Sequence, residues 1–263
     1  MECAESGYRG DWNLGGRFHG GWWQSIKEDW RKQIYLNDEA TIEQDYSGLH
    51  INLLYGLQGL QPQEDPYTID ALLGFKEAEQ RKIVKGIALM GINAKNPKKA
   101  FAAFAAFRQD QQTGSVERSL EDKQLQLLLD GFKEKHPAIA DSICTDKGVE
   151  LMAVDGRITS KVINYFTQKN IPVLTVHDSY ITPHTHTGEL RRVMNEAVTE
   201  ELKGFKINIE QQGVGLDQVQ AFKNADKTNT LDYSYEAIPS YNRTEGYSNR
   251  LKRHNKSLMK DDY

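Results

Sequence analysis

The chain has 263 residues, of which 38% are hydrophobic and 27% charged, so it holds enough apolar side chains for one sizeable core. Its formal net charge of −4 excludes binding to a polyanion through overall charge, and a nucleic-acid site would need locally gathered basic residues. The two cysteines, Cys3 and Cys144, exclude a disulfide framework, and no apolar run approaches the roughly 18 residues of a membrane span. A cytoplasmic protein without a membrane partner is expected, in a bacterial or phage-infected cell.

The first third of the chain changes from a strand pattern to a helix pattern. After Ser47, leucines recur at 49, 53, 57 and 60, which is helical spacing. The predicted elements, in order, are a turn-rich segment at 8–24, a short strand at 31–37, a strand at 40–45, a helix at 49–60 and a helix start near Pro66.

The middle of the chain is predominantly helical. Phe101, Phe104 and Phe107 recur at a spacing of three, which predicts a buried helical stripe. The predicted elements are helices at 76–93, 98–109, 117–134, 148–169 and 188–203, and strands at 173–178 and 205–210. The alternation of strands with long helices predicts an α+β or α/β core with helical insertions, followed by a polar, mildly basic tail at 223–263.

Two aspartates stand where predicted strands end. Asp45 closes "TIEQD" and Asp178 closes "VLTVHD". Because an unpaired buried carboxylate is costly, such groups are neutralised, paired or bound to a metal, and Mg²⁺ prefers oxygen ligands of this kind. The alternative is that each aspartate caps the helix or turn that follows it.

One face of the predicted helix 76–93 suits a nucleoside triphosphate. Arg81, Lys85, Leu89 and Asn93 lie four residues apart and therefore share a face. The two cations suit phosphates and the leucine suits a base or sugar. A solvated basic surface is the alternative, since many helices place Arg and Lys at this spacing.

Three stretches, "QDYSGLH", "RKIVKGIAL" and "TVHDSY", resemble motifs A, B and C of the A-family polymerases in the family's order. That superfamily includes bacterial A-type DNA polymerases and phage-type single-subunit RNA polymerases. Upstream, "NLGGR" at 13–17 is similar to the family's TxxGR or DxxGR element, with Asn at its first position. The resemblance covers roughly residues 13–182.

The resemblance implies an α+β fold with a right-hand polymerase palm sheet. A helical fingers insertion would occupy roughly 66–140 of a catalytic core at 1–222, and the tail at 223–263 would follow. Thumb and exonuclease domains would be reduced or absent, so the chain is either a minimal palm-and-fingers enzyme or a fragment of a longer one.

The resemblance also implies a two-metal site. Asp45, Asp178 and the backbone carbonyl of Tyr46 would hold two Mg²⁺ ions, with Mn²⁺ as a substitute. Arg81 and Lys85 would grip the triphosphate, and Lys85 would act as the catalytic proton donor to pyrophosphate.

Other matched positions would contact substrate or nucleic acid. Leu89 stands where an aromatic packs on the incoming sugar. Gly16, Arg17 and His177 would lie beside the primer–template, mainly through phosphate contacts.

Two departures from the family bear on the substrate. The Tyr-Gly pair that follows motif B is replaced by Asn93-Ala94, which would alter template handling. His50 stands at the sugar-selecting place, and its bulk should obstruct a ribose 2′-hydroxyl. This favours deoxynucleotides, whereas the His-Asp-Ser form of motif C favours ribonucleotides.

The sequence therefore predicts a small template-directed DNA polymerase that binds primer–template and nucleoside triphosphates, with a processivity or replication partner. A primase or RNA polymerase, and a catalytically inactive nucleic-acid-binding palm, are the alternatives. A cluster of tryptophans (Trp12, Trp22, Trp23, Trp30) could stack on exposed bases, but a core or interface cluster is the favoured interpretation. No zinc site is expected at His184 and His186, and Asp155-Gly156 is expected to end a turn.

Overall fold

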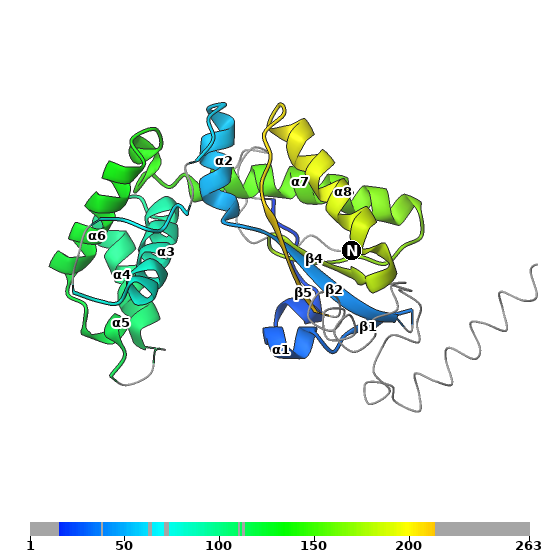
Figure 1. The fold of residues 1–263 in the computed structure, drawn as a ribbon, viewed down its shortest axis with the longest axis horizontal. Helices are drawn as coiled ribbons and strands as arrows, with labels where there is room; N and C mark the ends of the chain where they lie inside the picture. The colour runs from blue at the N-terminus through cyan, green and yellow to red at the C-terminus, as the bar shows by residue number, and fades with distance from the viewer. Residues whose placement is uncertain are drawn as a thin grey trace, which may run out of the picture.

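A computed structural model describes residues 16–37, 39–62, 65–70, 74–109, 111 and 114–213. The predicted tail at 223–263 lies outside these residues. Figure 1 shows two parts, which we call the sheet unit (β1–β5 with α1, α2, α7 and α8) and the helical unit (α3–α6). The chain enters the helical unit after α2 and leaves it just before α7. The fold is therefore a mixed α+β fold with an antiparallel sheet and a helical insertion.

Within the described residues the sheet has five strands, all paired antiparallel, in the order β1-β2-β4-β3, and β5 also pairs with β2. The strands are β1 (Tyr35–Leu36), β2 (Glu39–Tyr46), β3 (Leu174–Val176), β4 (Ser179–Pro183) and β5 (Ile209–Gly213). In this register Asp45 of β2 lies opposite Ser179 of β4 and Glu210 of β5. The end of β2 is thus flanked by two neighbouring strands.

Helices α2 (Leu49–Leu57), α7 (Gly148–Gln168) and α8 (Thr187–Glu201) pack beside the sheet (Figure 1). Two buried tyrosines attach the layers to each other. The hydroxyl of Tyr46 donates to the Met194 carbonyl of α8 at 2.7 Å, and that of Tyr180 lies 2.9 Å from the Thr159 hydroxyl of α7. Both hydroxyls are satisfied inside the core, so the polar tips of these large side chains cost little.

The helical unit contains α3 (Glu77–Asn93), α4 (Pro97–Gln109), α5 (Val116–Ser119) and α6 (Asp122–Lys135). Phe104 is fully buried and Phe101 and Phe107 are partly buried against the same core, which confirms the predicted stripe. The predicted helix at 117–134 is two helices, because Leu120 is extended and buried between them. A capping box between Glu121 and Gln124 then starts α6.

Four other boundaries differ from the sequence prediction. The helix start near Pro66 is wrong, because the Asp65 carboxylate accepts hydrogen bonds from the Tyr67 amide and the Thr68 hydroxyl and forms a turn instead. The strand at 31–37 is short, since α1 (Glu28–Arg31) precedes it, and the strand predicted from 205 begins only at Ile209. The strand at 173–178 ends at Val176, because His177 turns to a positive φ of 55°.

Three short 3-10 helices complete the described elements: η1 (Trp22–Gln24), η2 (Ala140–Ser142) and η3 (His184–His186). None of the helices in the described part of the chain is both long and apolar enough to cross a membrane.

Candidate active site

Two carboxylates meet at the end of β2. Asp178 lies in the tight turn that joins β3 to β4, directly before Ser179, which is opposite Asp45. The backbone amide of Tyr46 donates to the Asp178 carbonyl at 3.4 Å, so the turn is attached to the end of β2. His177 is exposed at the tip of the same turn. The hairpin therefore brings together two aspartates that are 133 residues apart in the sequence.

The environment of the Asp45 carboxyl disfavours its charged form. Burial raises its pKa to about 7, and Asp178, Glu210 and Glu43 add to the rise, while Lys85 lowers it. Its Oδ1 is buried, and no described residue offers that atom a hydrogen bond. A buried carboxylate oxygen without a donor calls for a proton or a cation. The residues present therefore fit a divalent cation at this place.

Glu210 is a neighbouring carboxylate that sequence reasoning missed. It lies opposite Asp45 on β5 and accepts a hydrogen bond from the Ser47 hydroxyl. The alternation in "FKINIE" predicted a strand, but nothing in the sequence paired that strand with β2. Among the described residues, no group of three or more His, Cys, Asp or Glu side chains has an arrangement suited to a metal ion. Any cation here would take its remaining ligands from substrate or water.

The predicted face of α3 exists, since Arg81, Lys85, Leu89 and Asn93 are all exposed. Arg81 forms a two-point ion pair with Asp65, with Nε–Oδ2 and Nη2–Oδ1 distances of 2.5 and 3.0 Å. The Asn93 amide donates to the Leu89 carbonyl at 2.8 Å. Lys85 is the member of this face that acts electrostatically on Asp45.

Tyr67, which sequence reasoning also missed, lies beneath these cations. Arg81 and Lys85 stand 5.4 and 5.9 Å from the centre of its ring. Burial raises the pKa of Tyr67 to about 12, with Asp178 among the smaller causes. A Cβ atom on Gly48, at the start of α2, would lie 3.2 Å from its hydroxyl. Tyr67 thus fills the junction between the α3 face and the carboxylates, and its loop position gave no periodic signal.

The structure places Arg17 in a buried network. Its Nε donates to Asp155 Oδ2 at 2.5 Å, and its Nη2 lies 3.1 Å from His50 Nε2. Asp155 was expected to end a turn. That interpretation is wrong, because Asp155 is fully buried within α7. Burial lowers the pKa of His50 to about 4, and Arg17 adds to the effect, so His50 is neutral at pH 7. Gly16 packs directly on α7, where its carbonyl lies 2.4 Å from a Cβ built on Gly156.

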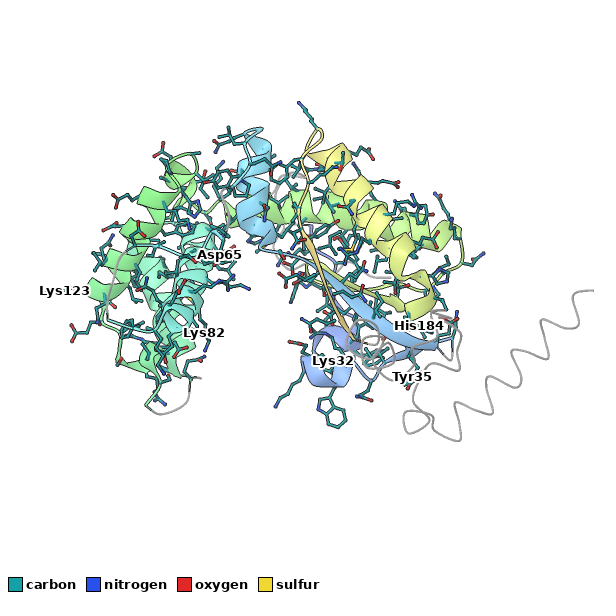
Figure 2. All side chains as sticks on the ribbon, in the orientation of Figure 1. Lys32, Tyr35, Asp65, Lys82, Lys123 and His184 are labelled. Carbon is teal, nitrogen blue, oxygen red and sulfur yellow. The ribbon has the colours of Figure 1, made fainter. Side chains whose placement is uncertain are left out.

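The two loop histidines are far from this site. His184 lies beside Ala40 at the start of β2, whereas Asp45 is near the end of that strand, and Figure 2 shows His184 on the side of the sheet unit away from the helical unit. His184 Nδ1 lies 3.3 Å from the Ala40 carbonyl, and His186 Nδ1 lies 3.0 Å from Glu189. Both rings therefore have protein partners.

The tryptophans divide between packed and exposed positions. Trp23 donates its indole N–H to the Thr175 carbonyl at 2.9 Å and so attaches η1 to β3. Trp22 and Trp30 are exposed, so they are not core residues, and the interface alternative stays a prediction; Trp12 lies outside the described residues.

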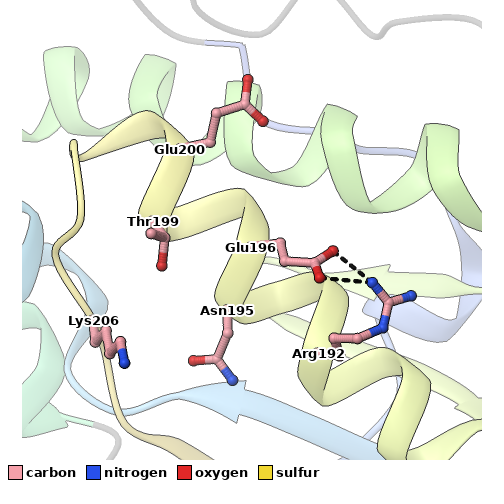
Figure 3. A pocket seen from close by; sticks show the side chains of 6 residues that line it. All are labelled: Arg192, Asn195, Glu196, Thr199, Glu200 and Lys206. Carbon is pink, nitrogen blue, oxygen red and sulfur yellow. Dashed lines mark hydrogen bonds and ion pairs between the residues drawn. The ribbon is translucent and has the colours of Figure 1, made fainter.

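A separate hollow lies along α8, and neither Asp45 nor Asp178 lines it. Figure 3 shows its lining, in which Arg192 pairs with Glu196 and Lys206 stands across from Asn195. The lining side chains are on α8, apart from Lys206, which follows the helix, and they include none of the predicted site residues. We therefore assign the candidate site to the carboxylates rather than to this hollow.

Neither a protein-family model nor a curated protein sequence matches the chain. Solved structures do match, among them the POL domain of Pol1 from M. smegmatis in complex with DNA primer-template and dNTP. The identity is 10%, the match covers 66% of this chain and 39% of that chain, and the TM-score is 0.33. The chain thus matches well under half the length of that polymerase domain.

Proposed function

We propose that the chain is a template-directed nucleotidyltransferase, a small DNA polymerase that adds deoxynucleotides to a primer 3′ end. The observation that carries the proposal is the meeting of Asp45 and Asp178 at the end of β2, with Asp45 Oδ1 buried and without a donor among the described residues. A lysine on the facing helix, Lys85, acts on the same carboxyl. Paired carboxylates beside a cation suit chemistry on a magnesium-bound triphosphate.

Asp45, Asp178 and the Tyr46 carbonyl are the residues that would hold Mg²⁺, or Mn²⁺ in its place. Two such ions, when bound, supply activation of the 3′-hydroxyl and charge stabilisation of the leaving pyrophosphate. The protein's contribution is to fix one carboxylate on β2 and the other in the adjacent β3–β4 turn, so that little rearrangement is needed when substrate arrives.

The α3 face would hold the triphosphate. Lys85 would bind phosphate oxygens and give a proton to the pyrophosphate as the P–O bond breaks. In the free protein, the pair with Asp65 keeps the Arg81 guanidinium ordered. When substrate binds, Arg81 would exchange Asp65 for a phosphate group. Leu89 would cover the sugar and Asn93 would lie near the template base.

The second candidate is ribonucleotide polymerisation, as in a primase or a single-subunit RNA polymerase. Ser179 favours it, because the His-Asp-Ser form of motif C resembles that of the phage-type RNA polymerases. Its hydroxyl lies 2.6 Å from Glu43 and 3.0 Å from the Val176 carbonyl, so here it stabilises the hairpin. His50 favours deoxynucleotides, because it is a bulky ring at the position that faces the sugar in the family.

Primer extension tests the proposal. A labelled primer on a DNA template is incubated with Mg²⁺ and either deoxynucleotides or ribonucleotides, using wild type and Asp178→Ala. Asp141→Ala, at an exposed aspartate of η2, is the matched control. We expect extension by deoxynucleotides in the wild type and the control and none in Asp178→Ala.

The other outcomes separate the alternatives. Extension by ribonucleotides, above all without a primer, would support the primase or RNA polymerase. Binding of primer–template without any product from either nucleotide set would instead indicate a non-catalytic palm scaffold.

A further inference from the structure

A buried chain of three side chains runs from α7 to the start of α2. Asp155, 1% exposed at its side chain, accepts from Arg17 Nε at 2.5 Å, and Arg17 Nη2 reaches His50 Nε2 at 3.1 Å. Arg17 itself is 17% exposed. Removing charges from water is costly, so a pair this well buried has to be held by close geometry. The geometry here comes from the packing around it.

Backbone packing holds Arg17 in place. Gly16 lies directly against Gly156, with its carbonyl oxygen 2.4 Å and its carbonyl carbon 2.9 Å from where a Cβ on Gly156 would be. The consecutive residues Gly16-Arg17 thus dock on the consecutive residues Asp155-Gly156. Only glycine at position 156 allows this approach.

The network fixes the tautomer of His50. A guanidinium has donors only, so Arg17 must donate and His50 Nε2 must accept. In a neutral imidazole the proton is then on Nδ1. Nδ1 of His50 is buried, and no described residue offers it a partner. His50 therefore presents an N–H donor without an acceptor.

An unpartnered buried donor is expensive, and it is commonly retained where a ligand supplies the missing partner. The surroundings connect His50 to the carboxylate site. Asp178 is among the charges that act on Asp155, and Arg17 is among those that act on His177. His50 is in the first turn of α2, the helix that follows the strand of Asp45 in the sequence.

We infer that Asp155 is a positioning residue which, through Arg17, holds His50 as an Nδ1–H donor for an acceptor oxygen of the bound nucleoside triphosphate. The inference rests on the proposed function for the identity of the ligand. It goes beyond a steric gate, because it gives His50 a defined donor and assigns the orientation of that donor to Asp155. A steric gate would act with either tautomer of His50, whereas a hydrogen bond from Nδ1 requires the Nδ1–H tautomer.

Nitrogen-15 NMR of the histidine rings tests the tautomer without substrate. The protein offers an internal control in His136, which is buried and whose Nε2 lies 2.7 Å from the Pro66 carbonyl. A carbonyl only accepts, so His136 must be the Nε2–H tautomer, while Tyr55 donates to its Nδ1. We expect a protonated Nδ1 in His50 and a protonated Nε2 in His136 in the same spectrum. An Nε2–H tautomer for His50 would overturn the inference.

Asp155→Asn tests the positioning role. It keeps the side-chain volume and removes the charge that orients Arg17. We expect the His50 signals to become those of mixed tautomers, while His136 is unchanged. Glu201→Gln is the matched control, because it removes a carboxylate charge from an ion pair with Arg157, two residues after Asp155 on the exposed side of α7, and it should leave both rings unchanged.

Nucleotide incorporation is the second readout. In Asp155→Asn and His50→Gln, kcat/KM for deoxynucleotides should fall about tenfold or more, with Glu201→Gln unchanged. An unchanged kcat/KM in both variants would overturn the inference. If His50 has the expected tautomer but no nucleotide is incorporated, the proposed function fails instead, and the ligand part of the inference fails with it.

Discussion

Replacement of Gly156 by alanine should disturb the site through the backbone rather than through a functional group. The added Cβ would lie 2.4 Å from the Gly16 carbonyl oxygen and 2.9 Å from its carbonyl carbon. Neither atom belongs to a flexible side chain, so Gly16 has to move away. Arg17 then moves with it and Asp155 loses its cation.

The magnitude follows from three contributions. Overpacking of a close contact costs about 1–3 kcal/mol. Alanine gains about 1 kcal/mol over glycine inside a helix. Loss of one partner from a buried ion pair costs about 3–5 kcal/mol, which is an upper bound here because the Asp155 carboxyl can take up a proton. We expect a net loss of about 2–4 kcal/mol in the free energy of unfolding.

Urea denaturation followed by circular dichroism measures this loss. Gly86→Ala is the matched control, because Gly86 also lies inside a helix and its Cβ would meet Phe104 at an ordinary 3.7 Å. The control should be as stable as wild type or about 1 kcal/mol more stable. Equal stability of Gly156→Ala and Gly86→Ala, with unchanged His50 ring signals, would refute the reasoning about this contact.

Three further predictions concern charge and hydrogen bonding. Burial raises the pKa of Asp155 to about 6, so the folded state binds more protons than the unfolded state between pH 4 and 6. The free energy of unfolding should therefore fall as pH rises through that window. Asp155→Asn should flatten that part of a plot of urea midpoint against pH. Asp45→Asn should weaken Mn²⁺ binding, measured by electron paramagnetic resonance, at least about tenfold, because loss of a residue that only supports a metal ligand already weakens metal binding by that much. Asp141→Asn should bind Mn²⁺ as the wild type does. Tyr55→Phe should cost about 1–3 kcal/mol in the same unfolding assay, because it leaves the buried His136 Nδ1 without its donor at 2.7 Å, and an unchanged midpoint would contradict this.

The sequence predicted the parts of the fold that depend on local pattern. Helical spacing located α3, α4, α7 and α8 to within a few residues, and the strand ends drew attention to Asp45 and Asp178. Boundaries failed where a single residue decided them, as at extended Leu120 and at His177 with its positive φ.

Long-range partners were beyond sequence reasoning. Asp155 looked like the end of a turn because its partner, Arg17, is 138 residues away. Glu210 could be identified only from the pairing of β5 with β2. Tyr67 could be identified only from the packing of α3 over its loop. Periodicity shows which face of an element is buried, but it contains no information about which charge lies opposite.

The connection between the two units decides whether Lys85 can act on the carboxylates at all. The loop that leads into α3 is held at several points. The Lys135 ammonium donates to the Asp65 and Thr68 carbonyls, His136 donates to the Pro66 carbonyl, and Asp65 binds Arg81. Both ends of the helical unit are thereby attached to one short segment.

This attachment has a consequence for substrate binding. If phosphate displaces Asp65 from Arg81, the lysine and histidine contacts of the segment remain, so α3 keeps its place while one guanidinium is released. A triphosphate would then bind to an α3 face that is already positioned. The cost is the loss of one partly exposed ion pair, and such a pair contributes about 0–1 kcal/mol to stability. Arg81 can therefore stay paired in the free protein and still be available to the substrate.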